Sequence, residues 1–370
     1  MKLLILDENY PHFDNLMGDV FVHVRAKEYN RQHTVKVFSF FHSPGSLVYE
    51  GIPLQLFDST EKLLEALSDY QPDRILIHFY QFWMLESIIK KVTVPFIIWV
   101  HGYEALGWYR RLFNYTLYSP VLLNYIISNT RQQFHFRKLI RYANSTRQVS
   151  FVFVSAWMKK ITETDSLAKI NNCCIIPNPI DTQLFKYREK DPELRKNILL
   201  LRSFGTRKYA NDIAVDAIQL LVTKPFFKEL QFTIIGQGGL FKKITAPLVH
   251  YSNVELQEKA VRQVLIPALH KGYGIFLCPT RQDAQGVSMC EAMSSGLVPV
   301  TSCNTAIPEF VTDKQTGFAT SNASEVAAAI EIMYYQPGLF QQISRQAAIA
   351  IRQTCSLDTV VKKELIIIEN

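Results

Sequence analysis

The most informative segment of the chain reads Cys278-Pro-Thr-Arg-Gln-Asp-Ala-Gln-Gly-Val-Ser-Met-Cys-Glu-Ala-Met-Ser-Ser-Gly-Leu-Val-Pro-Val300. It begins just after Ile275–Leu277, an apolar run typical of the end of a buried strand. Gly286 interrupts the segment, Val287–Ser295 has helical character, and Gly296 is a typical helix terminator. The segment therefore predicts a strand, a glycine turn, a short helix and a further strand, which is the repeating pattern of an α/β fold.

Two carboxylates flank the predicted glycine turn: Asp283 precedes it, and Glu291 follows eight positions later within the helix. The unpaired amides at a helix N-terminus, here those of Val287 and Ser288, act together with the helix dipole to favour a bound anion. Amides can hold a diphosphate while carboxylates accept hydrogen bonds from sugar hydroxyls, so this combination suits a nucleotide-sugar. The alternative is an ordinary strand–glycine–helix unit, since most such units in α/β proteins bind no phosphate.

Length and composition agree with a two-domain globular protein. A chain of 370 residues exceeds the usual size of a single hydrophobic core. Its 48% hydrophobic and 20% charged residues are ordinary for a globular protein, and no apolar run reaches the length that spans a membrane. The six cysteines lack the spacing of zinc ligands. With Met1–Leu6 interpreted as a first strand rather than a signal peptide, we expect a cytoplasmic protein.

Both halves of the chain alternate strand-like and helical segments, which predicts parallel sheets with helices on both faces. The first half has expected strands at Lys2–Asp7, Thr34–Phe38, Arg74–His78, Pro95–His101 and Gln148–Val154, and helices such as Met17–Asn30 and Lys62–Asp69. Two prolines within Ile176–Asp181 predict a linker. The second half has expected strands at Asn197–Leu201, Gln231–Ile235, Ile275–Leu277 and Val298–Thr301, and a last helix near Leu357–Ile368.

The positive charge of the chain is concentrated in one segment. No Asp or Glu occurs from Ala105 to Thr162, where aromatic residues are interleaved with cations. The cations are Arg110, Arg111, Arg131, Arg137, Lys138, Arg141, Arg147, Lys159 and Lys160. Such a segment suits an anionic membrane surface; nucleic acid is not expected as a partner, because no nucleic-acid-binding motif accompanies the charge. The alternative is a solvated basic face whose aromatic side chains turn into the core.

Segment 278–300 and several shorter motifs together resemble retaining glycosyltransferases of the GT-B fold, of the glycosyl transferases group 1 (family 4) type. That family has two Glu separated by seven residues; here Asp283 takes the place of the first. The other motifs are Ile176-Pro-Asn-Pro-Ile-Asp181 with Phe185, Leu200–Lys208, Ile234–Gly238 and Ala306–Glu309. The resemblance covers roughly 175–310 and is weaker in the first half. It implies two Rossmann-like domains facing each other across a cleft, with the C-terminal helix returning to the first domain.

The resemblance also implies roles for individual residues of the second domain. Asp283 would contact the donor sugar and Glu291 the ribose, and both are predicted to belong to the catalytic centre. Arg202, with either Lys208 or the better spaced Arg207, would stabilise negative charge on a leaving diphosphate. The predicted donor-binding residues are Arg202, Arg207, Lys208, Gly236, Gly286, Val287, Ser288 and Glu291. No metal ion and no cofactor is expected.

In the first domain the best candidate is His101. It ends an apolar strand and is followed by Gly102, which places it at the carboxyl edge of the sheet, where open α/β sheets bind ligands. We predict that His101 contacts the sugar or the diphosphate; the alternative is a capping residue satisfied by backbone. The loop Pro11–Gly18 follows the first strand, and Gly18 and Gly102 are the candidates for a phosphate or acceptor loop.

The expected function is transfer of a hexose from a UDP- or GDP-sugar to a saccharide or lipid-linked acceptor, in surface polysaccharide or lipopolysaccharide synthesis. The acceptor-side domain would comprise 1–180 with about 355–370, and the donor domain 181–354. Two alternatives stay open: a sugar-nucleotide 2-epimerase, and a non-catalytic scaffold that binds nucleotide-sugars. A dinucleotide oxidoreductase is disfavoured, because Gly236-Gln-Gly238 would need its third glycine at the position of Phe241.

Overall fold

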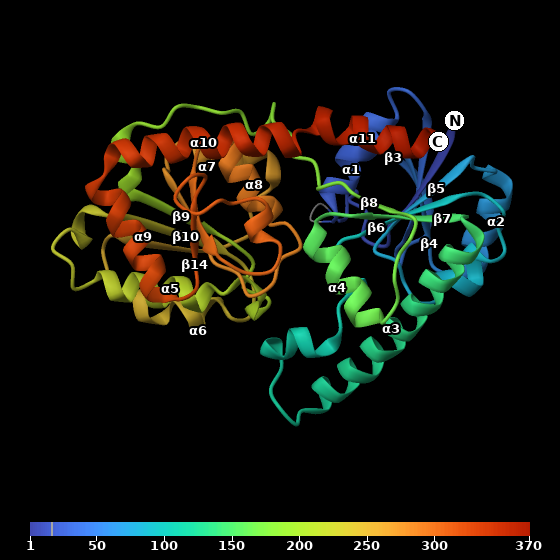
Figure 1. Cartoon of the computed structure of the whole chain (residues 1–370), viewed down its shortest axis with the longest axis horizontal. Helices are drawn as coiled ribbons and strands as arrows, with labels where there is room; N and C mark the ends of the chain where they lie inside the picture. Colours follow the sequence, from blue (N-terminus) through green and yellow to red (C-terminus); the bar gives the residue numbers. More distant parts are fainter. Residues whose placement is uncertain (16–17) are drawn as a thin grey trace. The chain divides into compact units, whose positions relative to one another are not determined.

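The computed structural model describes residues 1–15 and 18–370, which divide into two compact units (Figure 1). Unit 1 comprises Met1–Pro179 and Asp358–Asn370, and unit 2 comprises Ile180–Leu357. The chain therefore leaves unit 1 within the proline-containing segment 176–181 and returns to it near the C-terminus. In the described part of the chain, no helix combines the length and the apolar character needed to cross a bilayer.

Unit 1 is built on a mostly parallel sheet whose strands run in the order β3-β4-β2-β1-β5-β6-β7-β8. The strands are β1 Lys2–Leu6, β2 Thr34–Phe40, β3 Gly45–Tyr49, β4 Ile52–Phe57, β5 Arg74–His78, β6 Phe96–Val100, β7 Val149–Phe153 and β8 Cys173–Ile175. The central strands are buried along most of their length, as expected of parallel strands covered on both faces. Because β1, β5 and β6 are parallel neighbours, the residues that follow them meet at one edge.

The edge of this sheet departs from the predicted purely parallel pattern. Strands β3 and β4 form an antiparallel hairpin in which Tyr49 pairs with Ile52. The two turn residues, Glu50 and Gly51, have φ values of 44° and 85°. A two-residue turn with positive φ at both positions matches the twist of the strands it joins. Sequence reasoning missed the hairpin because Glu is not one of the residues that usually mark the first position of such a turn.

The helices of unit 1 are α1 Val20–Tyr29, α2 Thr60–Tyr70, α3 Pro120–Thr146, α4 Ala156–Ser166 and α11 Leu357–Glu369. The helix expected from Met17 begins at Val20, and Met17 itself lies outside the described residues. The longest, α3, begins with an N-cap serine whose side chain accepts the amide of Leu122, followed by proline at its first turn. Its sequence has weak amphipathic periodicity, and we did not predict it.

The last helix, α11, is held in unit 1 by a buried polar cluster centred on Glu364. The Glu364 carboxylate accepts hydrogen bonds from Arg25 Nε at 2.9 Å, Tyr29 Oη at 2.6 Å and Trp99 Nε1 at 3.2 Å. Both members of the Arg25–Glu364 ion pair have fully buried side chains. Removing one partner from such a pair leaves the other charge buried and uncompensated, which lowers the free energy of unfolding by about 3–5 kcal/mol. Residues from the C-terminus are thereby tied to the first helix (Figure 1).

Unit 2 is a parallel sheet with strand order β11-β10-β9-β12-β13-β14. The strands are β9 Asn197–Leu201, β10 Gln231–Gly236, β11 Val254–Glu258, β12 Ile275–Cys278, β13 Val298–Ser302 and β14 Phe318–Thr320. The helices are α5 Asn211–Leu221, α6 Phe241–Thr245, α7 Ile266–His270, α8 Val287–Ser294, α9 Ala323–Tyr335 and α10 Pro337–Cys355. Gly286 immediately precedes α8, and Gly296, with φ of 91°, follows it, so both predicted glycine boundaries are confirmed.

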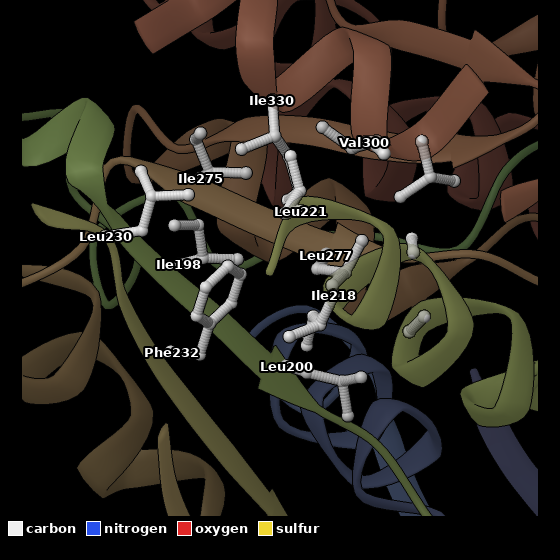
Figure 2. Close-up of a cluster of buried hydrophobic side chains, with 14 of the residues drawn as sticks. Ile198, Leu200, Ile218, Leu221, Leu230, Phe232, Ile275, Leu277, Val300 and Ile330 are labelled. Atoms are coloured by element: carbon white, nitrogen blue, oxygen red, sulfur yellow. The ribbon is translucent and has the colours of Figure 1, made fainter. Parts of the chain in front are cut away.

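Alternate residues of β9, β10 and β12 pack into two cores, one on each face of the sheet. Ile198 and Leu200 of β9 meet α5 and α9 on one face (Figure 2). Leu199 of the same strand joins the second core, which contains buried residues of α8 and α10. The period of two along the strand therefore directs side chains to helices on both faces. This packing fixes α8 on the second face of the sheet, and the loop that follows β12 leads into its N-terminus.

Candidate functional site

The N-terminus of α8 is shaped by a tight turn between Asp283 and Gly286. Asp283 Oδ1 accepts the Gly286 amide at 3.0 Å and the Gln285 amide at 3.4 Å. Gly286 has φ of 82° and ψ of 58°, a left-handed conformation that favours glycine. The first amides of the helix, at Val287 and Ser288, cannot have partners within the helix itself. The turn thus presents hydrogen-bond donors of the kind that hold anions.

Arg202 lies beside this turn, as the sequence predicted. It follows β9 directly, and its Nη1 is 3.9 Å from Asp283 Oδ2. Its Nη2 donates to the Cys278 carbonyl at 3.3 Å, and only 7% of the residue is exposed. Its Nε has no hydrogen-bond partner among residues 1–15 and 18–370. Neighbouring parallel strands therefore bring together a cation, a carboxylate and a helix N-terminus.

Lys208 joins the same group through the loop that follows Arg202. Its carbonyl accepts the Arg281 amide at 2.8 Å, which ties this loop to the segment after β12. The ring of Tyr209 lies close to two cations, with its centroid 5.1 Å from Arg202 Cζ and 5.2 Å from Lys208 Nζ. Arg207 contributes its carbonyl to Arg281 Nη1 at 2.9 Å. Lys208 therefore lies near Arg202, with Tyr209, which was not predicted, in contact with both cations.

Gly236 has a structural reason to be glycine, independent of any ligand. A Cβ atom at this position would lie 2.0 Å from the Arg202 carbonyl oxygen. Real Cβ atoms do not approach backbone so closely, so a side chain here would displace the segment that carries Arg202. The predicted donor-site role of Gly236 is therefore supported only indirectly, through its close contact with the backbone of Arg202.

Glu291 lies inside α8 and is almost completely buried. Its Oε1 accepts a hydrogen bond from Gln263 Nε2 at 2.6 Å, and 6% of the residue is exposed. Burial raises the pKa of Glu291 to about 7, while the bond from Gln263 opposes this rise. Near neutral pH the group can therefore either accept or donate a hydrogen bond. Gln263 was missed because it belongs to a separate segment with no motif of its own.

In unit 1, His101 lies at the end of β6, where the sequence placed it. Its Nε2 is 3.0 Å from Nδ1 of His78, the last residue of the neighbouring strand β5. The two rings are nearly parallel, with an interplanar angle of 17°. Burial lowers the pKa of both imidazoles well below their ordinary value, and the nearby Arg25 charge lowers them further. Sequence reasoning did not select His78, although its position at a strand end was the available signal.

The turn after His101 is closed by Glu104, which was also missed. Glu104 Oε1 accepts the His101 amide at 2.6 Å and Oε2 accepts the Gly102 amide at 3.1 Å. The residue is completely buried, and burial raises its pKa to about 7, against the opposing effect of the backbone amides. The alternative interpretation of His101, as a residue in a locally capped turn, therefore describes its backbone amide, which donates to Glu104. Gly102 lies within this capped turn.

The loop after β1 carries the remaining predicted position, Gly18. The amide of Gly18 donates to the Asn15 carbonyl at 3.3 Å, and a Cβ atom would lie 2.4 Å from the Asn9 carbonyl oxygen. Nearby, burial and the Asp19 charge raise the pKa of Asp7 well above its ordinary value, and burial raises the pKa of Asp19 to about 6. The close backbone contact accounts for glycine at 18. Residues 16 and 17 of this loop lie outside the described residues.

The basic segment forms mainly the loop before α3 and α3 itself. Phe136 is buried, while Tyr118 is fully exposed and Phe134 is more than half exposed. Arg110 is bound by Asp165 through three hydrogen bonds of 2.7–3.0 Å, so one of the nine cations is neutralised. The aromatic side chains of this segment are therefore divided between core and surface.

The chain was compared with protein families, curated sequences and solved structures. Residues 195–335 match the family described as Glycosyl transferases group 1. The structure is similar to sucrose-phosphate synthase from Thermosynechococcus elongatus, with a TM-score of 0.79, 11% identity, and coverage of 100% of this chain and 98% of that one. It is also similar to a glycosyltransferase from Rickettsia africae, with a TM-score of 0.73, 16% identity, and coverage of 99% of this chain and 97% of that one. A third similar structure is Anabaena HepE in complex with UDP-glucose, with a TM-score of 0.70, 16% identity, and coverage of 100% of this chain and 99% of that one. No curated protein sequence matches the chain.

These findings confirm the predicted resemblance and fold class. The chain has the GT-B fold, with two Rossmann-like units, and residues 195–335 of its second unit match the model of the Glycosyl transferases group 1 family. The match to the family lies within unit 2, which also carries the cluster of Arg202, Asp283 and the α8 N-terminus.

Proposed function

We propose that the protein is a retaining glycosyltransferase that moves a hexose from a UDP- or GDP-sugar to a saccharide or lipid-linked acceptor in surface polysaccharide or lipopolysaccharide synthesis. The observation that carries the proposal is the convergence of Arg202, Asp283 and the N-terminus of α8 inside the group 1 domain. Supporting it, one of the similar structures contains UDP-glucose. The cluster suits a donor because it joins a diphosphate-binding helix end to a carboxylate.

The chemistry follows from where charge develops. The anomeric carbon loses its bond to the diphosphate oxygen and gains a bond to the acceptor oxygen, on the same face of the sugar. The acceptor's hydroxyl proton passes to the leaving phosphate. Arg202, Lys208 and the α8 amides would stabilise the growing negative charge. Asp283 would hold sugar hydroxyls and Glu291 the ribose, while His101 would contact the donor from unit 1.

A thermal-shift screen against a panel of nucleotide-sugars is the first test. A ligand that binds only the folded state raises the melting temperature, so the correct donor should stand out from the others. The same donor is then incubated with saccharide acceptors, and products are identified by mass and by the anomeric configuration of the new bond. Transfer with retention supports the proposal. A free epimer of the donor would indicate an epimerase, and binding without turnover would indicate a scaffold.

Metal independence is a separate part of the proposal. The cations expected to balance the leaving group are side chains, so turnover should survive prior dialysis against EDTA. Loss of activity that Mg²⁺ or Mn²⁺ restores would overturn this part and leave the remaining assignment standing.

We further propose that the protein docks on an anionic membrane through α3 and the loop before it. Apolar side chains more than half exposed gather there, and exposed cations lie on the same helix. The apolar residues are Leu117, Tyr118, Val121, Leu123, Ile127 and Phe134; the exposed cations are Arg131, Lys138 and Arg141. Apolar anchors beside cations are the combination by which peripheral proteins bind anionic lipid. Such docking would bring the enzyme to a lipid-linked acceptor.

Vesicle co-sedimentation tests the membrane proposal. Binding should require anionic lipid and weaken as salt is raised, because the attraction of basic side chains to the surface is screened. The variant Y118S/V121S/I127S should bind more weakly than the wild type at equal salt. A control variant, V249S, replaces one exposed apolar residue of unit 2 and should bind as the wild type does. Equal binding to neutral vesicles would contradict the proposal, as would no binding to either kind.

A further inference from the structure

Within residues 1–15 and 18–370, Gln263 is the side chain that hydrogen-bonds the carboxyl group of Glu291. Its Nε2 donates to Glu291 Oε1 at 2.6 Å. The second oxygen, Glu291 Oε2, makes no hydrogen bond to the described residues and is not sealed from solvent. The protein therefore holds one oxygen of this carboxyl group and leaves the other open to a ligand.

The amide of Gln263 is kept in place by the packing of its own segment. Gln263 begins the short 3-10 turn Gln263–Leu265, which runs directly into α7. Ile266 of α7 packs against the same core cluster that contains Met289 of α8. This shared core brings together two segments whose paired side chains are 28 positions apart in the sequence. Groups carried on packed elements hold the geometry of a site more closely than groups on free loops.

The Gln263 amide can hold the carboxyl group of Glu291 in either protonation state. A carboxylate only accepts hydrogen bonds, and a neutral carboxyl group still accepts through its carbonyl oxygen, so a donating Nε2 suits both forms. The reverse orientation, with Gln263 Oε1 facing Glu291, suits only the protonated form. The bond from Gln263 opposes the rise in the pKa of Glu291 that burial causes. Without the amide, the pKa of Glu291 should therefore be higher still.

The other charged and titratable groups around α8 do not replace this bond. The charge of Asp181 raises the pKa of Glu291. On α7, burial lowers the pKa of His270 to about 3, so its ring is neutral where Glu291 titrates. On α10, Arg352 donates to a serine of α8 at 3.2 Å. Of the groups that shift the pKa of Glu291, Gln263 is the one that favours the charged form.

We propose that Gln263 is a positioning residue for nucleoside recognition: it holds the Glu291 carboxyl group as a hydrogen-bond acceptor and leaves Oε2 to accept from a ribose hydroxyl of the donor nucleotide. This inference rests on the proposed function and deepens it, because the site would select ribonucleotides over deoxyribonucleotides. Both residues belong to unit 2, so the inference needs no residue of unit 1.

Nuclear magnetic resonance of glutamate carboxyl carbons tests the contact without any ligand. In protein with ¹³C-labelled glutamate, the Glu291 signal is assigned by its loss in E291Q. Q263M keeps the length of the side chain but removes the amide, so it should raise the pKa of Glu291. Q257M is the matched control, because Gln257 Nε2 donates to Glu255 Oε1 at 2.7 Å on β11, and it should leave the Glu291 titration unchanged. An unchanged pKa in folded Q263M would overturn the inference, as would a lower one, which would mean that the carboxyl group donates to the amide.

Nucleotide binding tests the consequence for the ribose. UDP and GDP are each compared with their 2′,3′-dideoxy forms by calorimetry. The wild type should bind the ribonucleotide about tenfold more tightly, the usual scale for a hydrogen bond to a charged group. Q263M should lose most of this difference while its affinity for the dideoxy form stays the same, and Q257M should behave as the wild type does. An equal loss of affinity for both forms would indicate a structural role only and would overturn the inference.

The pH dependence of this preference supplies a further readout. The ratio of the two dissociation constants cancels the titration of the diphosphate itself. In the wild type the preference for ribose should rise as pH increases through about 7, where Glu291 becomes a carboxylate. In Q263M any remaining rise should occur at higher pH, and a preference that does not vary with pH in the wild type would contradict the proposed role.

The binding results also separate this inference from the proposed function. If neither UDP nor GDP binds, the proposed function fails and the role in ribose recognition fails with it. If a nucleotide binds without preference for the ribose hydroxyls, the proposed function stands and this inference is overturned.

Discussion

The strand ends of the two units carry opposite kinds of polar chemistry. In unit 2, the guanidinium of Arg202 and the carboxyl group of Asp283 lie beside a helix N-terminus. In unit 1, burial lowers the pKa of the His78 and His101 rings well below the ordinary value, and the neighbouring Glu104 side chain accepts hydrogen bonds from backbone amides. The same sheet edge can thus be built to balance a charged ligand or to orient a neutral one. Transfer from a nucleotide-sugar needs both, because a diphosphate carries charge and a sugar presents hydroxyls.

Replacing Arg202 should give the largest effect, because it removes the central cation of unit 2. We expect R202A to lower kcat/KM by about 100- to 1000-fold, with R202K recovering part of the loss since lysine keeps the charge without the fork of donors. Transfer assays give the activity and thermal shift gives donor binding. K224A, which removes a lysine paired with Glu331 instead, is the matched control. Wild-type turnover in folded R202A would show that the charged cluster of unit 2 takes no part in the reaction.

The charge of Asp283 should matter separately from its role in the turn. D283N keeps an oxygen that can accept the Gly286 amide but removes the negative charge beside Arg202. We expect transfer to fall about tenfold, the usual scale for a hydrogen bond to a charged group, while stability changes little. D283A should lose more of both, because the turn also loses its acceptor. If D283N and D283A were equally stable and equally active, Asp283 would have neither role.

Glu104 offers a test of unit 1 that needs no substrate. Burial raises its pKa from an ordinary 4.5 to about 7. Between these values the folded protein holds a proton that the unfolded chain releases, so stability falls as pH rises through this interval. E104Q cannot titrate, and its melting temperature should therefore decline less between pH 5 and pH 8. E61Q, at an exposed position of α2, should follow the wild type; an unchanged slope in E104Q would contradict the raised pKa.

The smallest predicted effect concerns the glycine turn. Gly286 has φ of 82°, and a Cβ atom there would meet its nearest neighbour, Ile307 Cδ1, at 3.3 Å. G286A should therefore cost about 1–2 kcal/mol of backbone strain, measured by denaturant unfolding, with a modest loss of donor binding as α8 shifts. G239A is the control, because nothing lies within 4 Å of a Cβ atom at that position. A cost no greater than that of G239A would show that the turn tolerates side chains.

Local signals predicted much of the fold. Gly286 and Gly296 marked the ends of α8 because a helix boundary depends on the φ values of a few adjacent residues. Apolar runs predicted the central strands because a buried strand, too, is marked by a few adjacent residues. The hairpin β3–β4 was missed because its turn begins with Glu50, and α3 was missed because its apolar spacing is weak.

The candidate sites were predicted only in part. Arg202 and Asp283 were selected from motifs that resemble a known family, and His101 was selected because it ends a predicted strand. Gln263 was missed because its importance lies in the residue it contacts, and His78 was missed although it ends a predicted strand. A partner's identity depends on which strands become neighbours, and a single sequence does not state that order.

What the sequence alone determined is therefore local: which segments form strands and helices, where glycine permits a turn, and which charged residues follow strand ends. The tertiary structure decided which of these groups meet. Arg202 and Asp283 come together across β9 and β12, and Arg25 is paired with Glu364 by the return of α11 to unit 1. Such contacts form only when segments distant in the sequence are buried together. The conformational entropy lost and the hydrophobic free energy gained on burial depend on the whole core rather than on any short pattern.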